Sequence, residues 1–218
     1  MRDEPLVDWE WVFGHLDDIG EATLEHIQLT VIAIAVGFAI SLAASLLIYR
    51  DRRYYGPLTG ISGFLYTIPS LALFAFLVPI TGLSVLTAEI GLVSYTLLIL
   101  IRNIVAGLDG VPADIREAAT GMGYAPFERL VRVELPLALP VIVAGIRIAT
   151  VTIVGLVTVA GAIGQGGLGG FMLRGFRRGF PTQIYIGAIL TVALAIAIDV
   201  ALQLAQRRLT PWSRARGR

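Results

Sequence analysis

Residues 117–136 read EAATGMGYAPFERLVRVELP, a polar stretch set between two long apolar segments. The flanking segments, 84–106 and 137–160, are each long enough to cross the hydrocarbon core of a bilayer, which takes about 20 helical residues. Three further segments of this kind occur in the chain, at 24–48, 58–80 and 184–205. The sequence therefore predicts an all-α membrane protein with five transmembrane helices and one long polar loop, 107–136.

Composition supports a polytopic membrane protein. Of the 218 residues, 56% are hydrophobic and 15% are charged, whereas a soluble domain carries about 25% charged residues. The chain has no cysteine, and its two histidines, His15 and His26, lack metal-ligand spacing. We expect no metal and no cofactor in this chain. The net charge of +1 gives no basis for a nucleic-acid partner, and no nucleophile–base constellation indicates an enzyme.

The distribution of arginine predicts the orientation, because short cytoplasmic loops are enriched in basic residues. Twelve arginines lie on one side of the predicted spans: Arg50, Arg52, Arg53, Arg102, Arg116, Arg129, Arg132, Arg207, Arg208, Arg214, Arg216 and Arg218. The other side holds four: Arg2, Arg174, Arg177 and Arg178. The N-terminus is thus expected outside and the C-terminus in the cytoplasm. Segment 1–23 is predicted as extracytoplasmic or interfacial, 24–205 as the transmembrane domain, and 206–218 as a basic cytoplasmic tail.

The polar loop has the signals of two short helices. Pro112 suits the first turn of a helix, and Gly121 and Gly123 suit its end. Pro126 can begin a second helix, and Pro136 marks the entry into span four. The prediction is a helix–turn–helix lying on the cytoplasmic membrane surface, with an apolar knob made by Met122, Tyr124 and Phe127. The alternative is an ordinary amphipathic loop that docks on nothing.

The loop resembles the EAA loop of ABC-importer permeases. Glu117, Ala118 and Ala119 are followed by Gly123 six residues after the glutamate, and the stretch closes on Val133, Glu134, Leu135 and Pro136. Isoleucine is usual where this chain has Val133. Other strings resemble the osmoprotectant subfamily of these permeases: His26–Thr30 (HIQLT), Thr67–Leu73 (TIPSLAL), Leu100–Asn103 (LIRN), Gly145–Arg147 (GIR) and Ile163–Gly169 (IGQGGLG).

The resemblance implies a type I ABC-importer permease subunit that works by alternating access in the cell's inner membrane. The implied solute is glycine betaine, choline or carnitine; the alternatives are an ABC permease for methionine or another amino acid, or an ion-coupled secondary transporter. The implied partners are ABC ATPase subunits that carry the ATP–Mg, a second permease copy or paralogue, and an extracytoplasmic substrate-binding protein. The implied ATPase-coupling residues are Glu117, Ala118, Ala119, Gly121, Met122, Gly123, Tyr124, Phe127, Leu135 and Pro136.

Charged residues inside the apolar spans are candidates for the translocation path. Arg147 in span four and Asp199 in span five fall at similar depths, and intramembrane charges are usually paired. We therefore predict an Arg147–Asp199 ion pair, acting either as a structural staple or as a switch. Thr150, Thr158 and Gly161 continue the Arg147 face at helical spacing, either as path lining or for close helix packing. Glu89 is expected to meet the Arg174–Arg178 cluster or to attract a cation.

The glycine-rich run 164–170 is not a nucleotide loop, because a P-loop needs a lysine and this chain has none. It is predicted either as a flexible outer loop or as a tight outer turn that forms part of the outer gate. We assign Gly164, Gly166 and Gly167 to that gate. By resemblance, Thr67, Pro69 and Ser70 in span two join the candidate path.

Overall fold

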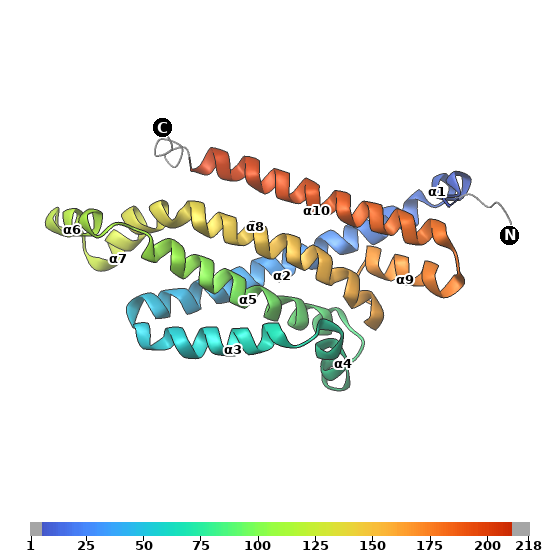
Figure 1. The fold of residues 1–218 in the computed structure, drawn as a ribbon, viewed down its shortest axis with the longest axis horizontal. Helices are drawn as coiled ribbons and strands as arrows, with labels where there is room; N and C mark the ends of the chain where they lie inside the picture. Colours follow the sequence, from blue (N-terminus) through green and yellow to red (C-terminus); the bar gives the residue numbers. More distant parts are fainter. Residues whose placement is uncertain (1–5, 211–218) are drawn as a thin grey trace.

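The computed structural model describes residues 6–210, a bundle of helices elongated along one axis (Figure 1). Its long helices are α2 (Leu16–Arg50), α5 (Val85–Asp109), α8 (Leu135–Ala160) and α10 (Pro181–Leu209). The shorter α-helices are α1 (Trp9–Gly14), α3 (Tyr55–Thr67), α4 (Ser70–Thr81), α6 (Ala113–Gly121), α7 (Pro126–Arg129) and α9 (Leu168–Arg178). Three further turns are the 3-10 helices η1 (Arg52–Tyr54) and η3 (Gly161–Ile163) and the π-helix η2 (Leu130–Glu134).

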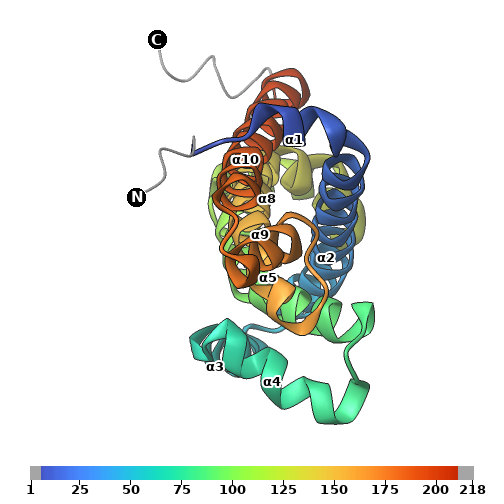
Figure 2. The same cartoon turned by 90° about the vertical axis from the view of Figure 1, so that its right-hand side faces the viewer.

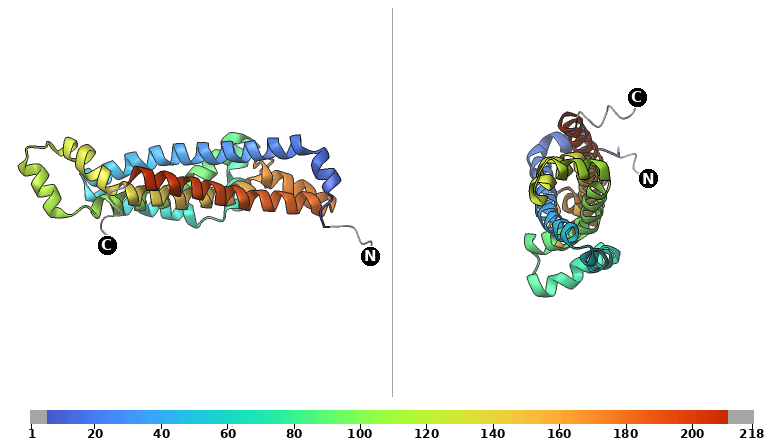
Figure 3. Two further views of the ribbon diagram at one scale, coloured as in Figure 1. Left: turned by 90° about the horizontal axis from the view of Figure 1, so that it is seen from above. Right: turned by 90° about the vertical axis from the view of Figure 1, so that its left-hand side faces the viewer.

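The helix lengths are those of a multi-pass membrane protein. Within residues 6–210, four helices are long and apolar enough to cross a membrane, and the bent pair α3/α4 can be counted as a fifth span. The described part of the chain has α6 and α7 at one end of the long axis and α1 at the other (Figures 1 and 3). The predicted tail residues Arg214, Arg216 and Arg218, like Arg2, lie outside the described residues.

The span predicted over 58–80 is not one continuous helix, although the bent pair can be counted as one span. The chain breaks at Ile68–Pro69, and α3 and α4 meet at 97°. Proline has no N–H and forces the preceding residue out of the helical region; Ile68 accordingly adopts φ −67° and ψ 128°. The carbonyl of Ile68 that the break leaves free accepts a hydrogen bond from the Tyr95 hydroxyl on α5.

The N-terminal segment is more helical than predicted. The described part of the segment predicted as 1–23 contains α1 and the first turns of α2, which begins at Leu16 rather than near residue 24. At 1.5 Å per residue, α2 is about 52 Å long, so it extends beyond a hydrocarbon core of about 30 Å. Asp8 caps α1 by accepting a hydrogen bond from the Trp11 N–H at 3.0 Å.

Small residues allow α2, α5 and α8 to pack closely in the centre of the bundle. A Cβ at Gly37 of α2 would lie 1.9 Å from Thr96 Oγ1 of α5, and one at Gly145 of α8 would lie 2.4 Å from Asn103 Cβ. Close approach at small residues is the usual basis of helix packing in membranes. The pair α3/α4 stands to one side of the bundle (Figure 2), and its Phe76 and Ile80 are exposed.

Candidate functional site

The polar loop 107–136 folds into two helices, as predicted, but the second does not stop before span four. α6 ends at Gly121, and Gly123 has φ +88°, a left-handed conformation that favours glycine. α7 then continues through η2 into α8. Pro136 lacks an N–H, and the π-helical turn shifts the bonding so that the Leu135 N–H donates to the Leu130 carbonyl. The second helix of the loop is therefore an N-terminal extension of α8 rather than a separate element.

The tip of the loop presents apolar side chains that nothing in the described chain covers. Met122 is 70% exposed and Phe127 is 75% exposed, whereas Tyr124 is half-buried. On α6, Glu117 and Ala118 are exposed, while Ala119 is buried. These apolar side chains are therefore available for contact with another protein.

The base of the loop is fastened by Glu134, a residue that the sequence analysis left without a role. Its side chain is fully buried. Its carboxylate accepts a hydrogen bond from the Tyr49 hydroxyl of α2 at 2.7 Å and one from Arg129 Nε at 2.8 Å. Arg116 Nε of α6 lies 3.2 Å from the same carboxylate. A buried carboxylate is stable only with such partners, so α2, α6 and α7 are joined at one point.

Arg129 extends this network, because it also donates from Nη1 to Thr120 Oγ1 of α6 at 2.8 Å. The sequence signal for Glu134 is a charged residue directly before a long apolar span. Such residues are usually exposed at a helix end, and the burial of Glu134 depends on Tyr49, which lies 85 residues earlier. Local sequence therefore did not reveal the network.

The predicted ion pair between α8 and α10 is confirmed. Arg147 Nε and Nη2 donate to the two carboxylate oxygens of Asp199, each at 2.9 Å. Gln206 lies beside the pair and donates from Nε2 to the Pro140 carbonyl at 3.0 Å. The Arg147 side chain is 23% exposed and that of Asp199 is 36% exposed. The pair lies in a surface groove, here called the α8 groove, lined by Ala144, Arg147, Ile148, Val151, Thr152 and Asp199.

The other residues predicted to share the Arg147 face diverge from it. Thr150 is buried and lines an apolar crevice between α2, α8 and α10 instead. Gly161 is also buried, because a Cβ there would lie 2.6 Å from the backbone of Gly169 and Gly170. The offsets of 3 and 14 residues rotate these positions away from the groove, so the predicted single stripe does not form.

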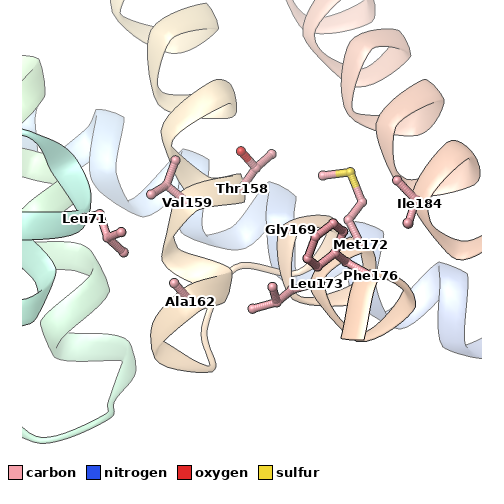
Figure 4. Close-up of a pocket in the computed structure, with 9 residues that line it drawn as sticks. All are labelled: Leu71, Thr158, Val159, Ala162, Gly169, Met172, Leu173, Phe176 and Ile184. Atoms are coloured by element: carbon pink, nitrogen blue, oxygen red, sulfur yellow. The ribbon is translucent and has the colours of Figure 1, made fainter. Parts of the chain in front are cut away.

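Thr158 lies in a second cavity, the outer cleft, of about 380 Å3. Figure 4 shows the cleft between α4, α8, η3, α9 and α10, with the Thr158 hydroxyl as the one oxygen among the drawn side chains. Its lining residues are Leu71, Thr158, Val159, Ala162, Gly169, Met172, Leu173, Phe176 and Ile184. Thr67, Pro69 and Ser70 lie at the break between α3 and α4, next to Leu71 in sequence.

The glycine-rich run forms a tight turn between η3 and α9, which is the backbone geometry of the second alternative predicted for it. Its part in an outer gate stays a prediction. Gly164, Gly166 and Gly167 have φ values of +81°, +139° and +51°. A Cβ on Gly167 would lie 2.3 Å from the Ala22 carbonyl oxygen of α2. The turn is therefore seated directly on the α2 backbone, which only glycine allows.

Known proteins are similar to this chain in sequence. The family described as "Binding-protein-dependent transport system inner membrane component" matches residues 33–215. The chain belongs to this family. It is 39% identical over 189 residues to the choline transport system permease protein OpuBB of Bacillus subtilis, with 87% of each chain covered. It is 37% identical over 204 residues to the osmoprotectant import permease protein OsmW of Salmonella typhimurium, covering 90% of this chain and 95% of that one.

Solved structures show the same fold. A chain of the inward-facing MetNI methionine ABC transporter, in its CY5 native crystal form, matches with a TM-score of 0.79 and 25% identity. The match covers 90% of this permease and 98% of that chain. An amino acid ABC transporter with histidines matches with a TM-score of 0.72 at 17% identity, which speaks for the fold alone.

Within the described residues, Glu89 of the permease has no contact with the arginine cluster on α9, which contradicts the first of the two alternatives predicted for it. That Glu89 attracts a cation stays a prediction. Its side chain is buried in α5, and neither carboxylate oxygen has a hydrogen-bond partner within the described residues. Arg174 instead lies over the Phe171 ring, 5.8 Å from its centroid. α9 ends at Arg178, and the side chains of Arg177 and Arg178 in its last turn are exposed.

Proposed function

We propose that this permease is the membrane-spanning subunit of an ATP-driven importer for a quaternary-ammonium compatible solute such as glycine betaine, choline or carnitine. The observation that carries the proposal is the loop 107–136, which presents Met122 and Phe127 on a base fastened by buried Glu134. Such an element suits a separate ATPase, which supplies the ATP–Mg. The names of relatives at 35–39% identity, among them choline, osmoprotectant and glycine betaine/carnitine/choline permeases, support the solute class.

The proposal includes an orientation in the inner membrane. The arginine distribution supports α6 and α7 in the cytoplasm and α1 outside, with α3/α4 counted as one of five spans. In this orientation the outer cleft and the glycine turn face an extracytoplasmic substrate-binding protein. The loop faces the ATPase at the opposite end of the bundle.

The translocation path is proposed to run along the α8 groove, between this chain and a second permease copy or paralogue. A partly exposed ion pair such as Arg147–Asp199 is costly against lipid. An irregular backbone like that at Ile68–Pro69 is tolerated at membrane depth only where it lies against protein or water. Both features therefore call for a covering surface other than lipid. A second copy supplies it, and also covers the exposed Phe76 and Ile80 of α4.

In this mechanism, ATP binding closes the ATPase pair and draws the two loops together, which opens the bundle outward. The binding protein then delivers the solute, and hydrolysis returns the bundle to its inward-facing state. The permease itself supplies positioning: the knob of Met122, Tyr124 and Phe127 receives the movement and passes it into the helix bundle.

Uptake into proteoliposomes tests the proposal. The permease is reconstituted with its ATPase and binding protein, and labelled glycine betaine, choline, carnitine and methionine are compared with ATP and with a non-hydrolysable analogue. Uptake of quaternary amines that needs hydrolysis supports the proposal. ATP-driven uptake of methionine alone would keep the mechanism and replace the solute. Uptake driven by an ion gradient without ATP would overturn the proposal.

The coupling knob is tested with Phe127→Ala. We expect loss of ATPase binding and of uptake, with unchanged thermal stability, because this ring is already 75% exposed. The matched control is Phe13→Ala at the opposite end of the molecule, where the ring is 70% exposed. Equal ATPase binding by both variants would contradict a docking role for Phe127.

A further inference from the structure

Helix α2 is fastened near both of its ends to the segments that flank α8. At the outer end, Glu25 Oε1 accepts a hydrogen bond from the Gly166 N–H at 2.9 Å. At the next residue, His26 Nε2 lies 3.0 Å from the Val154 carbonyl oxygen of α8. At the inner end, the Tyr49 hydroxyl donates to Glu134 at 2.7 Å. The two fastenings, at Glu25 and Tyr49, are about 36 Å apart along the helix.

The two helices differ in stiffness. α8 contains Pro140 in its interior and follows directly from the π-helical segment Leu130–Glu134. Prolines and π-turns are the usual places where helices bend. α2 is one continuous helix of 35 residues without a proline. By itself, α8 can therefore absorb a displacement of the loop by bending, whereas α2 resists bending.

The contacts at each end are placed to pass on a displacement. At the inner end, Glu134 also binds Arg129, which holds Thr120 of α6, so a movement of the loop reaches Tyr49 through hydrogen-bonded groups. At the outer end, the turn rests on α2 without intervening side chains: a Cβ on Gly167 would lie 2.6 Å from the His26 backbone nitrogen. A shift of α2 must therefore shift the turn.

We propose that α2 is a strut that transmits movement of the coupling loop to the glycine turn at the outer end. Glu25 and Tyr49 are the positioning residues that fasten the strut, and neither touches the α8 groove or the outer cleft. The inference rests on the proposed function, because it assumes that the loop is moved by an ATPase. In this inference, the hydrogen bonds of Glu134 pass the movement of the loop to α2, and the outer turn receives it from α2.

A double-mutant cycle tests the strut. Tyr49→Phe removes only the hydroxyl donor to Glu134, and Glu25→Ala removes the acceptor for the Gly166 N–H. We expect each change to lower the solute transported per ATP hydrolysed by about threefold to tenfold, the usual scale of coupling changes. We expect the double variant to be no worse than the more damaging single one, because either change disconnects the same strut.

Additivity is the outcome that overturns the proposal. Changes at sites this far apart normally act independently, so two unconnected structural contacts would give effects on the transport ratio that multiply. An unchanged transport ratio in both single variants would also overturn it. The matched controls are Tyr54→Phe, whose hydroxyl contacts Arg53 outside the network, and Glu21→Ala, an exposed position one turn before Glu25. Glu25→Gln keeps an acceptor and should retain the wild-type ratio.

A second readout does not depend on the solute or on Tyr49→Phe folding. The chain lacks cysteine, so spin labels on Asp114→Cys and Arg177→Cys report the distance between the α6 and α9 ends. Nucleotide should change that distance in the wild-type complex and not in Glu25→Ala. A change that persists in Glu25→Ala would sink the strut while leaving the importer intact. A nucleotide-dependent change in the label distance without uptake of any tested solute would contradict the proposed solute and still support the strut.

Discussion

At the scale of single residues, the Arg147–Asp199 pair indicates what surrounds this part of the permease. Its two hydrogen bonds satisfy both carboxylate oxygens of Asp199. The groove beside it leaves both groups partly open, which suits a water-filled path better than lipid. A pair that only stapled α8 to α10 would matter for assembly and not for transport.

Arg147→Ala separates these roles. We expect uptake to fall by about tenfold, which corresponds to about 1.4 kcal/mol and lies within the range by which residues of a coupling network act, while the amount of protein in the membrane stays close to wild type. Uptake assays and immunoblots of membranes measure the two quantities. The reverse variant with Arg147→Asp and Asp199→Arg together should recover part of the uptake. An equal loss of protein and of uptake would show that the pair only holds α8 and α10 together.

Glu134 is a second residue with a measurable role. Removing it with Glu134→Ala leaves Arg116 and Arg129 without their shared carboxylate, and breaking a buried ion pair costs about 3–5 kcal/mol. We expect a clear fall in the thermal unfolding temperature of the detergent-solubilised permease. Glu128→Ala is the control, since its pair with Arg132 is exposed and worth at most about 1 kcal/mol. Similar unfolding temperatures for the two variants would show that the Glu134 network does not stabilise the loop.

At the scale of elements, the turn between η3 and α9 depends on backbone conformations that other residues avoid. In Gly167→Ala the new Cβ meets the Ala22 carbonyl, and the residue must hold φ +51°. We expect destabilisation of about 1–3 kcal/mol, the cost of a strained backbone position, seen as a lower unfolding temperature. Gly20→Ala, in α2 with open space around it, should be neutral or stabilising by up to about 1 kcal/mol. If Gly167→Ala behaves like Gly20→Ala, the turn is not seated on α2.

At the scale of the whole molecule, the orientation can be tested because the chain has no cysteine. Asp17→Cys, near the start of α2, should react with a membrane-impermeant maleimide in intact spheroplasts. Asp114→Cys, in α6, should react only after the membrane is permeabilised. The physical basis is the arginine excess on the loop side. Labelling in the opposite order would overturn the orientation.

Much of the fold follows from local sequence. Runs of about 20 apolar residues indicated α2, α5, α8 and α10, and proline and glycine positions indicated the two helices of the loop. Proline also carried the information for the break at Pro69, which an apolar run on either side concealed. The depth of Arg147 and Asp199 in their spans was enough to pair them, because two intramembrane charges have few other ways to be satisfied.

The sequence by itself determined the class of protein, the apolar segments, the two-helix polar loop and the family, since each depends on composition or on residues close together in the chain. Only the tertiary structure decided that Glu134 meets Tyr49, that Glu25 holds Gly166 and that Thr150 turns away from Arg147. It also decided that Glu89 has no hydrogen-bond partner among the residues that the structure describes. These facts depend on which helices lie side by side and on how each is rotated. Helix contacts in a membrane are made by small residues and backbone proximity, which leave no periodic signal in a single sequence.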